Sequence, residues 1–114
     1  MTEERVRQFP AGKLLFEEGD DSYYAYLVKE GAVELSVRVG SEKKVLYIMK
    51  KGQVFGEMGI ISDDVRSATA ICLEPCTLSI ISRDMIEKKM RNADPYLKYV
   101  IDFLIDRVKT LSRS

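Results

Sequence analysis

Apolar residues alternate with polar ones, or form short apolar runs, over most of the chain before Ser82. Such runs, separated by turns that contain glycine, are typical of β-strands. They predict six strands, at residues 13–16, 25–29, 32–39, 44–49, 67–73 and 77–82. Short strands at this spacing favour a barrel or jelly roll, so the sequence predicts a mainly β fold.

After Ser82 the apolar period lengthens, which predicts two C-terminal helices flanking the barrel. Ser82 is suited to capping a helix at about 83–91, and Asp94 followed by Pro95 is typical of the start of a second helix at about 95–112. The second helix carries an apolar stripe at three- and four-residue steps, namely Leu97, Val100, Ile101, Leu104, Ile105, Val108 and Leu111. We expect one face of this helix to rest on the barrel, and the stripe either to complete that packing or to form an interface between two chains.

Length and composition predict a single domain over residues 1–114, with its barrel at about 9–82. The chain has 114 residues, of which 46% are apolar, enough for a core without metals or disulfides. Eighteen basic and eighteen acidic residues balance to zero, so there is no basic field to attract DNA or an anionic membrane. No apolar run is long enough for a signal peptide or a membrane span, and we expect a cytoplasmic protein.

The residue types that are missing argue against catalysis and against a metal site. The sequence has no histidine, which removes the commonest general base and the usual ligand of catalytic metals. Cys72 and Cys76 are two ligands where a structural zinc site needs four, so we expect buried, reduced thiols, although the spacing leaves a disulfide open. The acidic residues at 17–21 lack the spacing of a calcium-binding loop, and a turn accounts for them better.

One segment, residues 55–69, combines side chains suited to a ligand with a phosphate and a hydroxyl. Gly56 allows backbone N–H groups to approach a ligand closely. Arg66 is a planar, bidentate donor that suits a phosphate, whereas Glu57 can only accept hydrogen bonds and suits a hydroxyl. A phosphate at one end and a hydroxyl at the other describe a nucleotide sugar.

The same segment, with F-G-E at 55–57 and R-S-A-T at 66–69, resembles the phosphate-binding cassette of the cyclic-nucleotide-binding domain family. That family includes catabolite activator proteins, cyclic-nucleotide-dependent kinases and gated channels. The E-G-D turn at 18–20, the hairpin at 26–35 and the turn at 51–54 are similar to further motifs of the family in the same order, so the resemblance covers roughly residues 5–112. It implies a β-jelly-roll sensor that binds cyclic AMP or cyclic GMP without altering it, with no other cofactor.

The resemblance also implies a role for particular residues. Arg66 takes the phosphate oxygens, helped by backbone N–H groups near Met58, Gly59 and Ser67, and Glu57 accepts from the ribose 2′-hydroxyl. In the family, ligand capture moves the last helix over the base. The implied cassette contacts are Gly56, Glu57, Met58, Gly59, Arg66, Ser67 and Ala68, the implied base pocket is Leu35, Leu46, Val54 and Phe55, and the implied cap is Arg107 and Leu111.

Several alternatives stay open on the sequence alone. Arg66 and Glu57 are able to pair with each other as a structural ion pair, although we expect Arg66 to find no better partner than the phosphate. Asp63 and Asp64 either neutralise Arg66 in part or form a solvated loop tip. An interaction domain of the same fold that ignores nucleotides is the main rival function, and a cupin-like enzyme is a weaker one. Whether the chain acts alone, docks to a protein partner or belongs to a longer protein also stays open.

Overall fold

The computed structural model describes residues 5–58 and 65–112. In this part of the chain two four-stranded antiparallel sheets face each other, with the strand orders β1-β8-β3-β6 and β2-β7-β4-β5. The elements are β1 (Arg5–Phe9), β2 (Leu14–Phe16), β3 (Tyr24–Glu30), β4 (Val33–Val39), β5 (Glu42–Met49), β6 (Val54–Phe55), β7 (Thr69–Cys72), β8 (Cys76–Ser82), α2 (Arg83–Arg91) and α3 (Pro95–Ser112). This is the arrangement of a jelly roll, so the predicted fold class is confirmed.

The six predicted strands correspond to β2, β3, β4, β5, β7 and β8, and two further strands were not predicted. β1 has the sequence RVRQF, in which only Val6 and Phe9 are apolar, and it forms an edge of its sheet by pairing with β8 alone. The strands therefore begin at Arg5, earlier than the predicted start near residue 9. β6 has two residues and pairs only with β3. Neither strand is long or apolar enough to show a period of two in the sequence.

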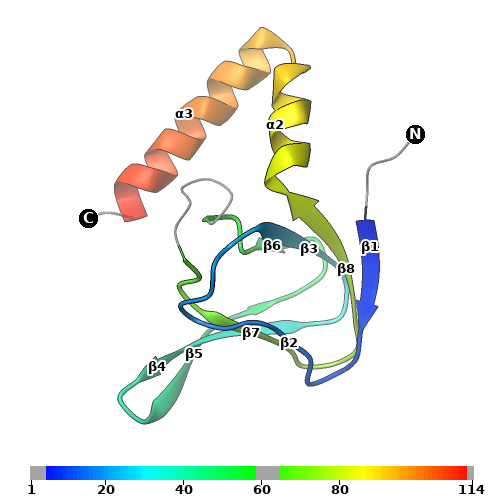
Figure 1. Cartoon of the computed structure of the whole chain (residues 1–114), viewed down its shortest axis with the longest axis vertical. Helices are drawn as coiled ribbons and strands as arrows, with labels where there is room; N and C mark the ends of the chain where they lie inside the picture. Colours follow the sequence, from blue (N-terminus) through cyan, green and yellow to red (C-terminus); the bar gives the residue numbers. More distant parts are fainter. Residues whose placement is uncertain (1–4, 59–64, 113–114) are drawn as a thin grey trace.

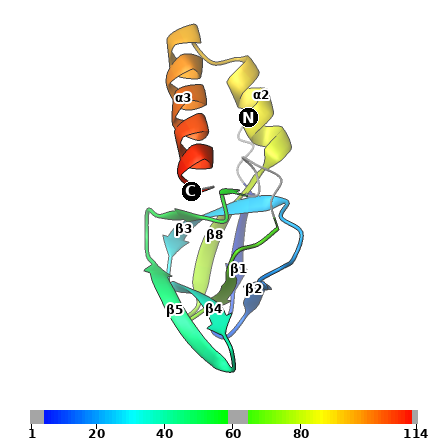
Figure 2. The ribbon, with the colours of Figure 1, turned by 90° about the vertical axis from the view of Figure 1, so that its left-hand side faces the viewer.

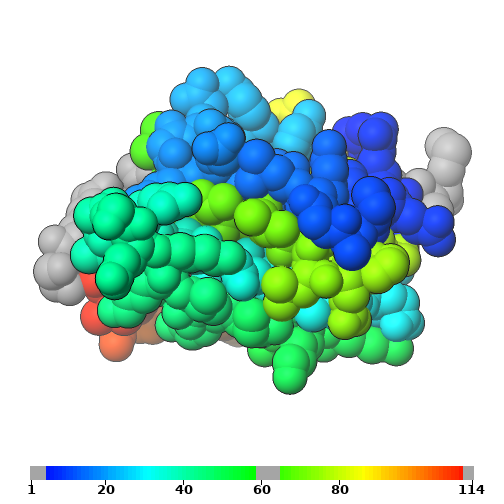
Figure 3. Space-filling model, turned by 90° about the horizontal axis from the view of Figure 1, so that it is seen from below, coloured from blue at the N-terminus to red at the C-terminus, as the bar shows by residue number. Residues whose placement is uncertain are grey.

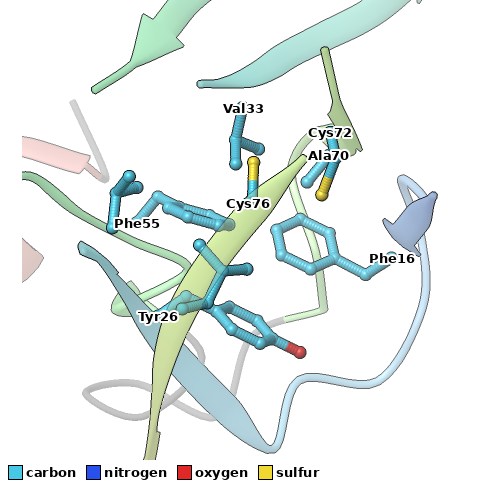
Figure 4. Close-up of a cluster of buried hydrophobic side chains, with 9 residues drawn as sticks. Phe16, Tyr26, Val33, Phe55, Ala70, Cys72 and Cys76 are labelled. Carbon is cyan, nitrogen blue, oxygen red and sulfur yellow. The ribbon is translucent and has the colours of Figure 1, made fainter. Parts of the chain in front are cut away.

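The core lies between the two sheets and is centred on three aromatic rings that pack against one another (Figure 4). The ring of Tyr26 lies 5.2 Å from that of Phe55, and the ring of Phe16 lies 6.1 Å from both. Around them pack six smaller buried side chains, those of Val28, Val33, Ala70, Cys72, Cys76 and Leu78. Both cysteines are free thiols, and burial, with a hydrogen bond to Cys76, raises the pKa of the Cys72 thiol to about 12.

The two helices begin at the predicted caps. The Ser82 hydroxyl accepts a hydrogen bond from the Met85 N–H at 3.1 Å, and the Asp94 carboxylate accepts one from the Tyr96 N–H at 2.9 Å. Figures 1 and 2 show that α2 continues from β8 away from the sheets and that α3 turns back toward them. Seen from below, the strands fill nearly the whole view, and little of the helices is visible beyond them (Figure 3).

The apolar stripe of α3 does not rest on the barrel, contrary to one of the two expectations. Leu97, Leu104 and Leu111 are 51%, 54% and 66% exposed, whereas only Ile101 and Ile105 within the stripe are half-buried. Among the described residues, no helix is long and apolar enough to cross a membrane. The fold therefore leaves an apolar face of α3 exposed, which includes Leu97, Leu104 and Leu111.

Candidate functional site

A cavity of about 200 Å³ opens between the sheets where β6 leads into the segment around Arg66. Nine residues that the sequence assigned to a ligand site line it, namely Leu35, Leu46, Phe55, Gly56, Glu57, Met58, Arg66, Ser67 and Ala68. The cavity has an apolar side from β4 and β5 and a polar side from the segment that contains Arg66. The tertiary structure thus brings the two predicted halves of the site together.

Arg66 is buried, with 6% of its surface exposed, and its guanidinium is fixed in place by three contacts. Nη1 donates to the Gly56 carbonyl at 3.0 Å, and Nη2 donates to the Tyr24 carbonyl at 2.6 Å. The guanidinium carbon lies 4.0 Å from the centre of the Phe16 ring, within the range of a cation–π interaction. Arg66 thus has neutral hydrogen-bond partners of its own, and the expectation that it has no better partner than a phosphate stays a prediction.

The backbone of Arg66 is held by the E-G-D turn. The Arg66 N–H donates to the Asp20 carbonyl and the Gly19 N–H donates to the Arg66 carbonyl, both at 2.8 Å. Gly19 has a φ of 91°, a conformation that glycine adopts without strain. The E-G-D turn and the segment that contains Arg66, which are far apart in the sequence, are thus held together by backbone hydrogen bonds. These bonds fix the position of the Arg66 backbone next to the cavity.

Two buried polar atoms at the cavity have no hydrogen-bond partner among the described residues: Arg66 Nε and Ser22 Oγ. Burial lowers the pKa of Arg66, and the nearby Tyr26, Asp20 and Glu57 partly oppose this shift. An arginine nevertheless stays charged at neutral pH. A buried cation with an unused N–H favours a site that receives an anion.

No ion pair joins Arg66 to Glu57, both of which the structure describes. The alternative of a purely structural pair between these two side chains is thus not the arrangement that forms. Gly59, expected in the cassette, and Asp63 and Asp64, considered as neighbours of Arg66, lie outside the described residues. Within the described ranges, no three side chains of the types that bind metals gather into a cluster.

The structure requires glycine at position 56 because the Arg66 guanidinium lies close to its backbone. Its φ is 78°, in the left-handed region that other residues rarely adopt, and its carbonyl is an acceptor of the Arg66 guanidinium. A Cβ at this position would lie 2.6 Å from Arg66 Nη1, closer than real Cβ contacts. A side chain here would displace the guanidinium.

Three residues expected at the site lie elsewhere in this structure. Val54 does not line the cavity and is 43% exposed, because neighbouring residues of β6 face opposite ways and Phe55 takes the inner position. Arg107 and Leu111, the expected cap, are exposed on α3 and do not line the cavity. Arg107 lies instead over the ring of Phe103, with 5.7 Å between its guanidinium carbon and the ring centre.

Four lining residues were not predicted from the sequence: Phe16, Ser22, Tyr47 and Met49. The two from β5 depend on a β-bulge, since Leu35 pairs with Tyr47 while the next residue, Ser36, pairs with Val45. Leu46 is the extra residue of this bulge, and a bulge lets neighbouring side chains face the same side. A strict alternation that places Leu46 inward would turn Tyr47 and Met49 outward, so the sequence pattern could not reveal them.

A jelly roll whose cavity joins a buried arginine to an apolar wall defines a β-module suited to small anionic ligands. The model of the family described as "Cyclic nucleotide-binding domain" matches residues 6–93, and the chain belongs to this family. It is 34% identical over 79 residues to the cyclic AMP receptor protein of Thermus thermophilus, a match that spans 68% of this chain and 37% of that protein.

Two further relatives support the same family. The chain is 28% identical over 111 residues to cGMP-dependent protein kinase 2 of Mus musculus, spanning 95% of the chain and 14% of the kinase. The structure of the EAL enzyme Bd1971 in its half-site-occupied form superposes with a TM-score of 0.89 at 26% identity, covering 96% of this chain and 98% of that one. The chain spans only a minor part of the two curated relatives.

Proposed function

We propose that this domain binds a 3′,5′-cyclic nucleotide in the cavity beside Arg66 and transmits binding through α3. The observation that carries the proposal is the buried Arg66 with its unused Nε, in a cavity that also holds the carboxylate of Glu57 and an apolar wall. A cyclic phosphate supplies the counter-charge that a buried guanidinium lacks, and a base supplies apolar surface for the wall. The EAL enzyme Bd1971 has been solved with cyclic AMP bound and with cyclic GMP bound.

In this proposal each polar group has one role. Arg66 binds the phosphate oxygens with help from the backbone N–H groups of Met58, Gly59 and Ser67, and Glu57 accepts from the ribose 2′-hydroxyl. Leu35, Leu46 and Phe55 lie against the base. We assign binding without catalysis to this cavity, whose groups all have a binding role in this proposal.

Transmission requires α3 to move. Arg107 and Leu111 lie outside the cavity, so they cap the base only in a second state in which α3 lies closer. The ligand favours that state only if it binds it more tightly than the state described here.

We place the domain in the cytoplasm as one regulatory unit over residues 1–114. Its two free thiols suit a reducing compartment, and its effector is either a protein partner or a second copy of the chain.

The first test is thermal unfolding with and without nucleotide. Cyclic AMP or cyclic GMP at about 100 times its Kd stabilises the fold by about 2.7 kcal/mol. For a domain of this size that raises Tm on the order of 10 °C. The two ligands should differ little, because Ser67 offers a guanine at most one hydrogen bond, worth about 0.5–1.5 kcal/mol.

Two matched ligands make this test specific. Noncyclic 5′-AMP should leave Tm almost unchanged, and 2′-deoxy cyclic AMP should raise it less than cyclic AMP because it lacks the partner of Glu57. If neither cyclic AMP nor cyclic GMP moves Tm, the domain is an interaction module that ignores nucleotides, and the proposed function is wrong.

We also propose that the exposed face of α3 pairs with a second copy of the chain. The strip formed by Leu97, Leu104, Val108 and Leu111 runs along one side of the helix and is 38–66% exposed. A continuous apolar strip of this kind is typical of an interface between identical helices. We therefore expect a dimer at high micromolar concentration in sedimentation velocity, and a folded monomer for the double variant Leu104→Asp, Leu111→Asp.

The control is Thr110→Asp, which adds one of the two negative charges of the double variant, at an exposed position on another face of α3, and should leave the dimer intact. A wild-type chain that sediments as a monomer with and without cyclic nucleotide would show that the strip serves another purpose.

A further inference from the structure

Tyr47 is a large aromatic side chain that lines the cavity yet remains 64% exposed. It lies on β5 opposite Leu35, which packs against the core, so the two belong to the inner face of the sheet. A lining residue with most of its surface in water marks the rim of the cavity.

The β-bulge at Leu46 brings three residues of β5 to the cavity. Leu46, Tyr47 and Met49 all line the cavity from one short stretch of β5, where strict alternation would allow fewer. The polar groups of the cavity come from another place, the segment holding Glu57 and Arg66. A ligand whose charged group contacts Arg66 therefore places its remaining part against β4 and β5.

We propose that Tyr47 is a stacking platform for the base of the nucleotide, built into the sheet and present before α3 moves. This inference rests on the proposed function. Every nucleobase has a π-face, so stacking adds affinity without reading the base edge. Tyr47 then contributes equally to cyclic AMP and cyclic GMP binding, and it holds the base on the strand side while the opposite side stays open to a cap.

Replacing the ring tests this role by isothermal titration calorimetry with cyclic AMP and cyclic GMP. Tyr47→Leu keeps an apolar side chain but removes the π-face, and we expect Kd to rise about five- to hundredfold for both ligands. Tyr47→Phe keeps the ring and should bind within about twofold of the wild type, since stacking does not need the hydroxyl. The matched control is Tyr96→Leu, which removes a tyrosine that is 84% exposed on α3 and does not line the cavity.

The outcomes separate this inference from the proposed function. A wild-type chain that binds neither ligand overturns the proposed function and the inference with it. If the wild type binds and Tyr47→Leu matches it within twofold, the cavity binds nucleotide but Tyr47 is no platform. A loss confined to one of the two ligands also overturns the inference, because stacking alone does not discriminate between adenine and guanine to that extent. Circular dichroism of the Tyr47 variants is expected to match the wild type, because the side chain is mostly exposed.

Discussion

Arg66→Leu should abolish measurable cyclic-nucleotide binding and should also lower the melting temperature of the empty domain. The binding is lost because leucine offers no charge and no donor to the phosphate. The stability falls because the guanidinium donates to the carbonyls of Gly56 and Tyr24 in the empty protein. Two hydrogen bonds from a charged group contribute roughly 3 kcal/mol in total, which corresponds to a fall in Tm on the order of 10 °C.

Arg66→Lys separates the two roles of this side chain. Lysine keeps the positive charge, but a single ammonium group cannot donate to two carbonyls in the planar geometry of a guanidinium. We expect this variant to fold and to bind cyclic AMP at least tenfold more weakly, as measured by calorimetry well below its Tm. Arg38→Leu is the control, because Arg38 is exposed, lies outside the cavity and donates to the Ser41 carbonyl. If Arg66→Leu binds cyclic AMP with a Kd within threefold of the wild type, Arg66 does not contribute to the binding site.

Gly56→Ala should weaken cyclic-nucleotide binding by more than tenfold through a clash with the guanidinium. The new Cβ would lie 2.6 Å from Arg66 Nη1, and the end of that side chain is the part able to move. Its movement breaks the hydrogen bond to the Gly56 carbonyl and takes the guanidinium away from the position that meets the phosphate. The left-handed backbone at Gly56, with φ of 78°, adds about 1–2 kcal/mol of strain for alanine.

Gly52→Ala is a close control for this variant. Gly52 has a φ of 88°, so alanine meets a similar backbone strain, but a Cβ there has no atom within 4 Å. Gly52→Ala should therefore lower Tm on the order of 5–10 °C through backbone strain alone, and Gly56→Ala should lower it further because it also loses the hydrogen bond from Arg66. Only Gly56→Ala should lose binding in calorimetry. Equal binding by the two variants would mean that Arg66 tolerates the displacement and that its exact position does not control affinity.

In these proposals α3 has two roles, because it caps the base and also carries the apolar strip that pairs with a second chain. If α3 moves to cap the base, Leu111 contacts the ligand and is no longer available for the contact between two chains. Ligand binding and self-association then influence each other reciprocally. If α3 remains where this structure has it, the exposed ring of Tyr47 is available to the base from the strand side, beside the buried rings of Phe16 and Phe55 that also line the cavity.

The sequence by itself determined the local features of this protein. Ser82 and Asp94 act as helix caps within three residues of their own position, and the turns at Gly31, Gly40 and Gly52 have the positive φ angles that glycine permits. Caps, turns and strand periods depend on neighbouring residues only, so they can be read from the order of side chains. The family motif likewise predicted that Glu57 and Arg66 share one site, and both line the cavity.

Tertiary structure decided what depends on pairing between distant segments. Arg66 donates to the carbonyl of Tyr24, 42 residues away, and which carbonyl is left open for it follows from the arrangement of the sheets. The bulge that brings Tyr47 and Met49 to the cavity is a property of the register between β4 and β5. Register, bulges and the direction of α3 result from packing over the whole fold, because a one-residue shift in pairing changes which side chains face inward without changing the local sequence pattern.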